Sequence, residues 1–389
     1  MSLRVCFLSK MFPPFAGGSG LYAYEMANAL GARGHDVDVY TQATDDEGDD
    51  RSVHTHDNVT VYTVTAARRY LVTVETLYYS LRARQAVDFE DYDVIHGTLM
   101  PASTIALSDR LGIETPLVVT SHGTSLGEAR SHAPELPSDY LLKYVFHPTN
   151  VVFDTIAGHA ADHVIAISSD SRDELAATYR VDPQNLSLIL HGVDTERYRP
   201  REGSHPAVSS DELTLLFVGR LVSRKGVSTV IEAMAELNRS DVELLIAGTG
   251  RHDERLRGIA RTLGVTDDVT FLGYVPDEDL PTLYSATDVF LFPSRYEGFG
   301  LVFLEALASG TPVIGTPVGG VPDIVEDGET GYVVPHDPAA FAEKITYLAD
   351  NPDILDAMSH AARAEAEDRT WDHVAGQVEE VYRRVLDDT

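Results

Sequence analysis

Two glutamates in the second half of the chain have a spacing that could serve sugar chemistry. Glu297 and Glu305 lie eight positions apart in SRYEGFGLVFLE (residues 294–305), which follows the apolar run DVFLFP. Carboxylates accept hydrogen bonds from vicinal hydroxyl groups. The glycines between them let a ligand approach the backbone, and a helix start suits a phosphate. The spacing alone is a weak signal, because Glu305 could simply pair with a nearby arginine.

Two cations precede these acids in the loop after the apolar run LTLLFVG (213–219). Arg220 and Lys225 stand before a helical pattern, where N–H groups also attract anions. Lysine supplies only four of the 30 cationic side chains, so a lysine kept in this loop is informative. We predict that Arg220 and Lys225 hold a pyrophosphate; the alternative is a solvated basic turn. Together with the loop GTPVGGVPDIV (315–325), the acids and cations form a strong pattern.

The elements that position these residues read as two α/β halves. The runs LRVCFLS (3–9) and LTLLFVG each precede a loop and a helical pattern. Further runs that predict strands are VDVYT, VIHGT, PLVVTSHG, HVIAIS and LSLILHG in the first half, and VELLIAG, VTFLG, VFLFP and PVIGT in the second. Continuous apolar runs that alternate with helices indicate parallel strands covered on both faces. We therefore expect a doubly wound domain over 1–200, a second over 201–371 and a C-terminal helix over 372–389.

Composition and charge limit the function further. The 389 residues contain 61 acids against 30 bases, a net charge of −31, which disfavours nucleic-acid binding. Such an acidic, lysine-poor chain is typical of salt-loving archaea. The single cysteine, Cys6, and the lack of a spanning apolar run or signal peptide predict a cytoplasmic protein. The acidic stretch 45–50 is expected to be a solvated loop.

The chain resembles glycosyltransferase family 4 over nearly its whole length. The likeness rests on PPFAGGSG, GARGHDVDVYT, AISSDSRDEL, HGVDTERYRP, VGRLVSRKG and, most specifically, the segment from VTFLGYVPDEDL to GETGYVVP. It implies a GT-B fold, in which two Rossmann-like domains face each other. It also implies transfer of a hexose-type sugar from a nucleotide diphosphate sugar, with retention of configuration and without a metal or other cofactor.

The resemblance also assigns roles to individual residues. Arg220 and Lys225 would bind the donor diphosphate, Glu297 the transferred sugar and Glu305 the ribose. The remaining donor-binding positions would be Gly17, Gly18, Gly298, Phe299, Gly300 and Leu301. His122, at the end of LVVTSHG, would approach the transferred sugar, although a histidine at a strand end is often structural. His191 stands where the family usually has asparagine.

The acceptor is less defined. The segment ARRYLVTVETLYYSLRAR (67–84) carries Arg68, Arg69, Arg82 and Arg84 beside tyrosines and leucines. At helical spacing it could meet an anionic membrane or a polyprenyl- or lipid-linked hydroxyl acceptor, or it could pack on the first sheet. Segment 141–153 leaves the same choice open. Two other functions stay as alternatives: an epimerase or phosphorylase of the same architecture, and a non-catalytic carbohydrate-binding module.

Overall fold

The computed structural model describes residues 2–13, 17–42, 55–65, 72–106, 113–131, 144, 147–201, 203, 205–208, 212–237 and 239–388. These residues form two compact units. The first contains most of the chain up to His191 and takes back the C-terminal segment from Trp371, and the second contains Gly192–Thr370. The chain thus passes into the second unit somewhat earlier than the boundary at 200/201 expected from composition.

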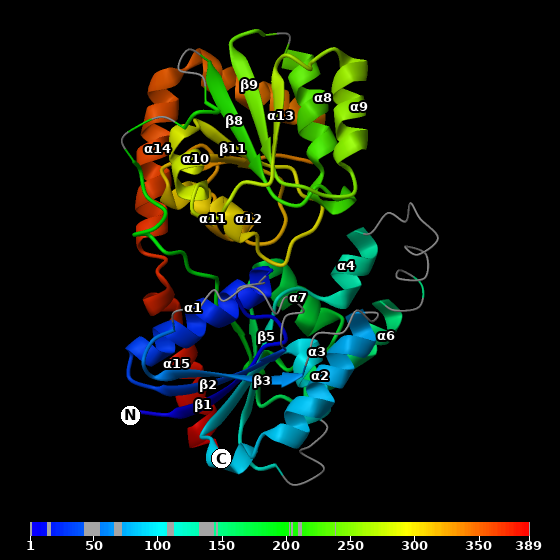
Figure 1. Ribbon diagram of the computed structural model, residues 1–389, viewed down its shortest axis with the longest axis vertical. Coiled ribbons are helices and arrows are strands. Elements are labelled where there is room, and N and C mark those ends of the chain that lie inside the picture. Colours follow the sequence, from blue (N-terminus) through cyan, green and yellow to red (C-terminus); the bar gives the residue numbers. More distant parts are fainter. Residues whose placement is uncertain are drawn as a thin grey trace. The chain divides into compact units, whose positions relative to one another are not determined.

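The first unit is built on a parallel sheet of seven described strands in the order β3-β2-β1-β4-β5-β6-β7 (Figure 1). The strands are β1 (Arg4–Leu8), β2 (Asp36–Gln42), β3 (Val59–Thr65), β4 (Val94–Thr98), β5 (Leu117–Ser121), β6 (His163–Ala166) and β7 (Leu186–Leu188). The described helices are α1 (Gly18–Ala32), α2 (Val72–Ala86), α3 (Leu99–Ala106), α4 (Ser125–Ser131), α6 (His147–Ala160), α7 (Ser169–Ala177) and α15 (Trp371–Asp387), with short 3₁₀ turns η1 (Phe89–Asp91) and η4 (Pro183–Asn185).

The second unit repeats this plan with six parallel strands in the order β10-β9-β8-β11-β12-β13. They are β8 (Leu213–Val218), β9 (Val242–Ala247), β10 (Val269–Gly273), β11 (Val289–Phe292), β12 (Val313–Gly315) and β13 (Gly331–Val333). The helices are α8 (Val227–Leu237), α9 (Asp253–Leu263), α10 (Leu280–Ala286), α11 (Leu301–Ala308), α12 (Val321–Ile324), α13 (Pro338–Asp350) and α14 (Pro352–Glu367), with the 3₁₀ turn η5 (Ser223–Lys225).

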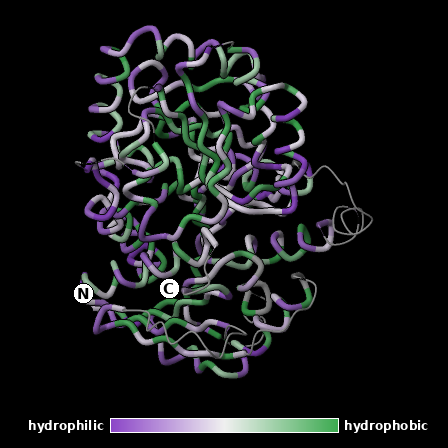
Figure 2. The backbone as a smooth tube through the Cα atoms, turned by 45° about the horizontal axis from the view of Figure 1, so that its top comes forward, coloured by the Kyte–Doolittle hydropathy of each residue, from purple (hydrophilic) through white to green (hydrophobic). Residues whose placement is uncertain are grey.

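The central strands follow from their apolar sequences. Val5, Phe7 and Leu8 of β1 and Leu215 and Leu216 of β8 are fully buried, as expected for strands covered by helices on both faces. Figure 2 shows these inner strands as predominantly hydrophobic within each unit. The two doubly wound parallel sheets confirm the predicted α/β fold class.

Two strands were not predicted. The edge strand β3 is largely exposed over its middle residues, so it lacks the continuous apolar run that marks the inner strands. Strand β13 has only three residues, too few for a periodic signal. The segment 67–84 was expected to be helical, and its described part lies in α2. The acidic stretch 45–50 lies outside the described residues.

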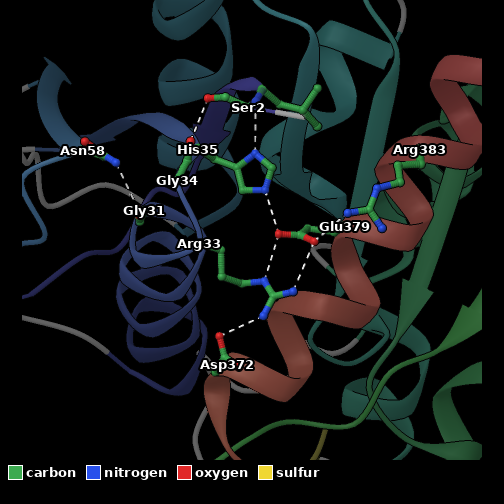
Figure 3. Close-up of polar contacts among 10 residues, drawn as sticks. Ser2, Gly31, Arg33, Gly34, His35, Asn58, Asp372, Glu379 and Arg383 are labelled. Atoms are coloured by element: carbon green, nitrogen blue, oxygen red, sulfur yellow. Dashed lines mark hydrogen bonds and ion pairs between the residues drawn. The ribbon is translucent and has the colours of Figure 1, made fainter.

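Helix α15 packs on α1 within the first unit, although it follows the whole second unit in sequence. Its Glu379 accepts from Arg33 Nε at 2.8 Å and lies 2.8 Å from His35 Nε2, while Arg33 also reaches Asp372 at 2.9 Å (Figure 3). Burial would raise the pKa of Glu379, but Arg33 and His35 bring it down to about 2. A buried, ionised pairing therefore attaches the C-terminal helix to the first unit.

Candidate functional site

The predicted charged residues lie at a branch in the second sheet. Strands β8 and β11 are neighbours, yet the chain runs outward from β8 to β9 and β10 on one side, and from β11 to β12 and β13 on the other. Open α/β sheets bind ligands beyond the carboxyl ends of strands at such a switch point. The loop after β8 carries Arg220 and Lys225, and the loop after β11 carries Glu297. The topology therefore brings the two predicted motifs to one edge.

Gly226 lets these two loops meet. It has a φ of 65°, and a Cβ atom there would lie 2.0 Å from the Pro293 carbonyl oxygen at the end of β11. No other residue fits this contact without displacing backbone. Next to it, the Arg295 N–H donates to the Arg224 carbonyl at 2.7 Å. Turn η5 is thereby fixed against the loop that carries Glu297.

Glu297 is the centre of an ion-pair cluster. Its Oε1 lies 2.5 Å from Lys225 Nζ and 3.2 Å from Arg224 Nη1, and it accepts from Ser294 Oγ at 3.0 Å. The Glu297 side chain is only 8% exposed and that of Lys225 only 11%. Burial would raise the pKa of Glu297, yet Lys225 and Arg224 bring it below its usual value, so the carboxylate stays ionised.

Arg220 adds a third cation to this edge. It is exposed at the end of β8 and lies close enough to Lys225 to affect its titration. Burial is the main cause that lowers the pKa of Lys225; Glu297 opposes the shift, and Arg224 and Arg220 add to it. Two cations paired with Glu297 and a third near Lys225 leave this edge with a net positive charge, which suits an anion.

Glu305 has a different environment. It lies in the second turn of α11, is 7% exposed, and accepts from the Tyr284 hydroxyl at 3.0 Å. Burial raises the pKa of Glu305 to about 7, although hydrogen bonds from Tyr284 and Tyr198 act in the opposite direction. Near neutral pH this carboxyl group can therefore be either protonated or ionised, unlike Glu297.

The segment between the two glutamates is shaped by packing. Gly300 caps α11 with a φ of 105°, and a Cβ atom there would lie 2.6 Å from the Phe292 ring. Phe299 is 3% exposed, its ring contacts that of Phe303 at a centroid distance of 5.5 Å, and its carbonyl accepts from the Gly320 N–H at 2.9 Å. Leu301 begins α11, and Gly298 is partly exposed beside Glu297. The helix start and its preceding glycines thus lie where the sequence predicted them.

His122 lies in the first unit, just after β5. Its ring stacks on His191 with centroids 5.5 Å apart and an interplanar angle of 13°, and contacts Tyr22 edge-on at 4.7 Å. The Nε2 atom is buried and has no hydrogen-bond partner among the described residues. Burial lowers the pKa of His122 to about 3, so the ring is neutral. A neutral imidazole can both donate and accept a hydrogen bond.

The same unit contains further rings around His122. Trp371, the first residue of α15, contacts both Tyr22 and His191. His96 lies at 2.5 Å from the Tyr382 hydroxyl and 2.7 Å from Thr120 Oγ1, which accounts for both of its ring nitrogens. We call Tyr22, His96, His122, His191 and Trp371 the ring cluster.

Gly17 and Gly18 start helix α1 in the same unit. Gly17 caps the helix, and its carbonyl accepts from Gly20 and Leu21. A Cβ atom at Gly18 would meet nothing within 4 Å. The helix start therefore carries no side chain at Gly17 or Gly18, and its N–H groups point in the direction that attracts anions.

Sequence reasoning missed several partners of these residues. Arg224 stands directly before Lys225, and this adjacency was the available signal. Ser294, Tyr284 and Tyr198 contact the two glutamates, but spacing gave no indication of them. Among the described residues, no group of three or more His, Cys, Asp or Glu side chains could hold a metal ion.

Two family models match the chain. Residues 16–197 match Glycosyltransferase Family 4, and residues 201–365 match Glycosyl transferases group 1. A D-inositol 3-phosphate glycosyltransferase of Streptomyces scabiei is 31% identical over 400 residues, covering 96% of this chain and 87% of the relative. The chain therefore belongs to the group 1 and family 4 glycosyltransferases, as the sequence motifs predicted.

Solved structures agree with this assignment. Sucrose-phosphate synthase from Thermosynechococcus elongatus superposes with a TM-score of 0.85 and 25% identity, covering 99% of this chain and 100% of that one. Anabaena HepE, solved in complex with UDP-glucose, has a TM-score of 0.73 and 21% identity, covering 98% and 100%; this likeness concerns the fold alone. The fold is GT-B, and the protein is a glycosyltransferase.

Proposed function

We propose that this glycosyltransferase moves a hexose-type sugar from a nucleotide diphosphate sugar to a hydroxyl acceptor, with retention of configuration and without a metal. The observation that carries the proposal is the pairing of Arg224 and Lys225 with Glu297 at the switch point of the second sheet, with Arg220 near Lys225. Among similar proteins, HepE was solved with UDP-glucose. A diphosphate at this edge would meet cations and a sugar would meet a carboxylate.

The leaving group determines most of the mechanism. When the bond between the sugar carbon and the phosphate oxygen breaks, negative charge grows on the departing diphosphate. Arg220 and Lys225 would stabilise that charge, and such electrostatic stabilisation is usually the largest single contribution to catalysis. Cationic side chains can thereby do the work that a metal does in other transferases.

Glu297 is assigned to sugar orientation rather than to nucleophilic attack. Its Oε1 already accepts from Lys225, Arg224 and Ser294, which lowers its nucleophilicity. We propose front-face displacement: the acceptor oxygen bonds to the sugar carbon, and its proton passes to the departing phosphate oxygen. The bond to the acceptor then forms on the same face of the sugar from which the phosphate leaves, so the configuration at the sugar carbon is retained.

Glu305 and His122 complete the proposed assignments. Glu305 at the start of α11 would accept from the ribose hydroxyls, with Tyr284 holding the carboxyl group in place. His122 would hydrogen-bond the transferred sugar through Nε2, the atom that has no partner among the described residues. The glycine start of α1, at Gly17 and Gly18, would admit the donor phosphate or the acceptor to the helix N–H groups.

A panel of nucleotide sugars tests the proposal. Incubating the protein with UDP-, GDP- and ADP-sugars, with and without EDTA, should show slow hydrolysis of one donor that EDTA does not change. NMR of the released sugar or transfer product should show the donor's anomeric configuration. An inverted product would contradict the retaining mechanism, and a lack of binding to every donor would contradict the proposed function.

We also propose that the protein is cytoplasmic and meets the inner face of the membrane through α2. Val74, Tyr78 and Leu81 are 50%, 36% and 49% exposed and follow one another at helical spacing, with Arg82 exposed beside them. On the opposite face Tyr79 is fully buried and donates to the Tyr40 carbonyl at 2.6 Å. The helix thus packs on the sheet and still presents an apolar face. Among the described residues, no helix could span a bilayer.

An anionic lipid surface suits this face because arginine is concentrated here in a chain of net charge −31. Arg68 and Arg69, which belong to the same sequence segment, lie outside the described residues. Co-sedimentation with phosphatidylglycerol vesicles at low salt should be weakened several-fold by Arg82→Gln/Arg84→Gln and by Leu81→Ser. The matched control Arg172→Gln, on α7, should bind as the wild type does. Unchanged binding by the α2 variants would favour a purely structural helix.

A further inference from the structure

Glu297 shares a single oxygen among three donors, and only one of them is assigned to the donor diphosphate. We propose that Arg224 is a positioning residue: it keeps Glu297 ionised and in place while Lys225 turns toward a bound diphosphate. The inference rests on the proposed function and names a residue that the sequence pattern did not assign to the site.

The need for such a residue follows from burial. Lys225 Nζ is in contact with Glu297 Oε1 at 2.5 Å, and both side chains are almost completely buried. A diphosphate that draws on the ammonium group weakens this ion pair. A buried carboxylate that loses its partner is costly and tends to take up a proton instead. Without a second cation, donor binding by Lys225 and ionisation of Glu297 would compete.

Arg224 has the geometry to prevent that competition. Its Nη1 lies 3.2 Å from Glu297 Oε1 and donates to the Tyr296 carbonyl at 3.2 Å. Its own carbonyl accepts from the Arg295 N–H at 2.7 Å. These contacts attach Arg224 to the Glu297 loop independently of Lys225. A guanidinium is charged at every relevant pH and has donors left for a second contact.

The surroundings of Glu297 offer no equivalent replacement. Among the described residues, Lys225 and Arg224 of turn η5 are the two cations within ion-pair distance. Ser294, on its own loop, contributes a neutral hydroxyl at 3.0 Å. The loop after β12 approaches Glu297 through Gly319, which has no ionisable group. Arg220 affects the pKa of Lys225 rather than that of Glu297.

Charge supports the same assignment. Arg220, Arg224 and Lys225 against Glu297 sum to two positive charges, which matches the two ionised oxygens of a nucleotide sugar diphosphate. Removing Arg224 leaves one positive charge and a carboxylate that depends on Lys225 alone. A variant without Arg224 is thus expected to lose the ionised form of Glu297 when donor binds, with a smaller effect on donor affinity.

The first test compares Arg224→Gln, Arg224→Lys and the control Arg261→Gln with the nucleotide sugar that the wild type turns over. Arg261 is exposed in the last turn of α9, which leads into the amino end of β10, away from the site. Arg224→Gln should lower kcat about tenfold or more at neutral pH. The acid limb of its kcat profile should move to higher pH, because Glu297 without Arg224 protonates more readily. In Arg224→Lys the acid limb should return to its wild-type position. In Arg224→Gln, KM should change less than kcat.

A second measurement does not require transfer. Calorimetric titration with UDP-glucose, GDP-mannose or ADP-glucose at pH 7, in two buffers of different ionisation enthalpy, reports the protons taken up on binding. Arg224→Gln should take up a clear fraction of a proton more than the wild type, in which Glu305, with a pKa of about 7, can also exchange protons on binding. The double variant Arg224→Gln/Glu297→Gln should match the wild type, since the carboxyl group at Glu297 is absent.

The outcomes separate the two proposals. Suppose that the wild type binds a nucleotide sugar, and that Arg224→Gln has the same acid limb of the kcat profile and takes up no more protons than the wild type. Arg224 then does not position Glu297. A uniform loss of activity across pH, with a lower melting temperature, would mean a structural role only and would overturn the inference equally. If the wild type binds none of the nucleotide sugars, the proposed function fails and the role of Arg224 fails with it.

Discussion

The two units present opposite chemistry on the same kind of doubly wound sheet. In the second unit, the loops after β8 and β11 bring Lys225 and Arg224 into ion-pair contact with Glu297, whose pKa is lowered. In the first unit, α1, β4, the segments after β5 and β7, and α15 each contribute one residue to the ring cluster, in which His96 and His122 are kept neutral because burial lowers the pKa of each to about 3. One topology therefore supports a charged site and a neutral one.

The difference shows how burial acts on paired and unpaired groups. Glu297 and Lys225 are buried together, so each stabilises the charge of the other. The histidines of the ring cluster have aromatic and hydroxyl neighbours instead, so burial removes their charge. Under the proposed function, the second unit would supply the charges that stabilise the departing diphosphate. The first unit would supply uncharged hydrogen-bonding groups for sugar hydroxyls.

Removing Lys225 should have the largest effect and would test the charged half of the comparison. Lys225→Ala is expected to lower transfer by about a thousandfold, roughly 4 kcal/mol of transition-state stabilisation, while the fold is retained. Donor turnover and a thermal melt measure the two quantities. Normal turnover by this variant would refute the assignment of the cation cluster to the diphosphate.

Removing Glu379 should test which contact attaches α15, and with it Trp371 of the ring cluster, to the rest of the first unit. Helix α15 contributes Trp371 and Tyr382 to the first unit, and Glu379 attaches it to Arg33 and His35 (Figure 3). Glu379→Ala is expected to cost about 3 kcal/mol in the free energy of unfolding near neutral pH.

The pH dependence gives the control for Glu379. Because its pKa falls to about 2 on folding, its contribution is present above about pH 4.5 and is lost as the pH falls toward 2. Denaturant unfolding of wild type and Glu379→Gln at several pH values measures this, and the two proteins should converge in acid. A difference that stays constant with pH would show that the carboxylate charge is not what attaches α15.

Glu305 should sharpen the contrast inside the second unit, because its pKa is raised while that of Glu297 is lowered. A carboxyl group with a folded pKa of about 7 contributes stability below about pH 4.5, which is lost as the pH rises toward 7. Glu305→Gln keeps an acceptor for Tyr284 and removes this titration. Between pH 5 and 8, the free energy of unfolding of Glu305→Gln should therefore fall less than that of wild type, by on the order of 2 kcal/mol.

The control is Glu254→Gln, exposed on α9, whose free energy of unfolding should change with pH as that of wild type does. If Glu305→Gln also showed the wild-type pH dependence, the raised pKa of Glu305 would be contradicted.

His122 should give the smallest effect and tests whether the ring cluster takes part in transfer. His122→Ala is expected to lower kcat/KM about tenfold, the loss of one neutral hydrogen bond to the sugar. Since the pKa of His122 is about 3, the shape of the pH profile from 5 to 9 should not change, in contrast with Arg224→Gln. His360→Ala, 84% exposed on α14, is the matched control. If His122→Ala had the same kcat/KM as wild type, His122 would not bind the transferred sugar and would serve only in packing.

Much of the fold could be predicted because its signals are local. The apolar runs at 3–9 and 213–219 became β1 and β8, and the predicted helix starts near Gly300 and after Lys225 lie within a residue or two of α11 and α8. Strands β3 and β13 were missed because an exposed edge and a three-residue strand lack that signal. The salt-loving origin suggested by the net charge of −31 stays a prediction.

The sequence by itself determined which residue types stand at the strand ends and which glycines must be there. Local sequence pattern is enough to place Arg220, Lys225 and Glu297 in loops after strands, and Glu305 in the second turn of the helix that follows. These properties depend on neighbours in the chain, and so they can be read from it.

Only the tertiary structure decided which charges meet. Lys225 and Arg224 reach Glu297 because Gly226 allows η5 to approach Pro293, and His191 and Trp371 reach Tyr22 from far along the chain. Ionisation depends on burial and on charges a few ångströms away, whatever their separation in sequence. For that reason two glutamates of one motif, Glu297 and Glu305, have pKa values shifted in opposite directions.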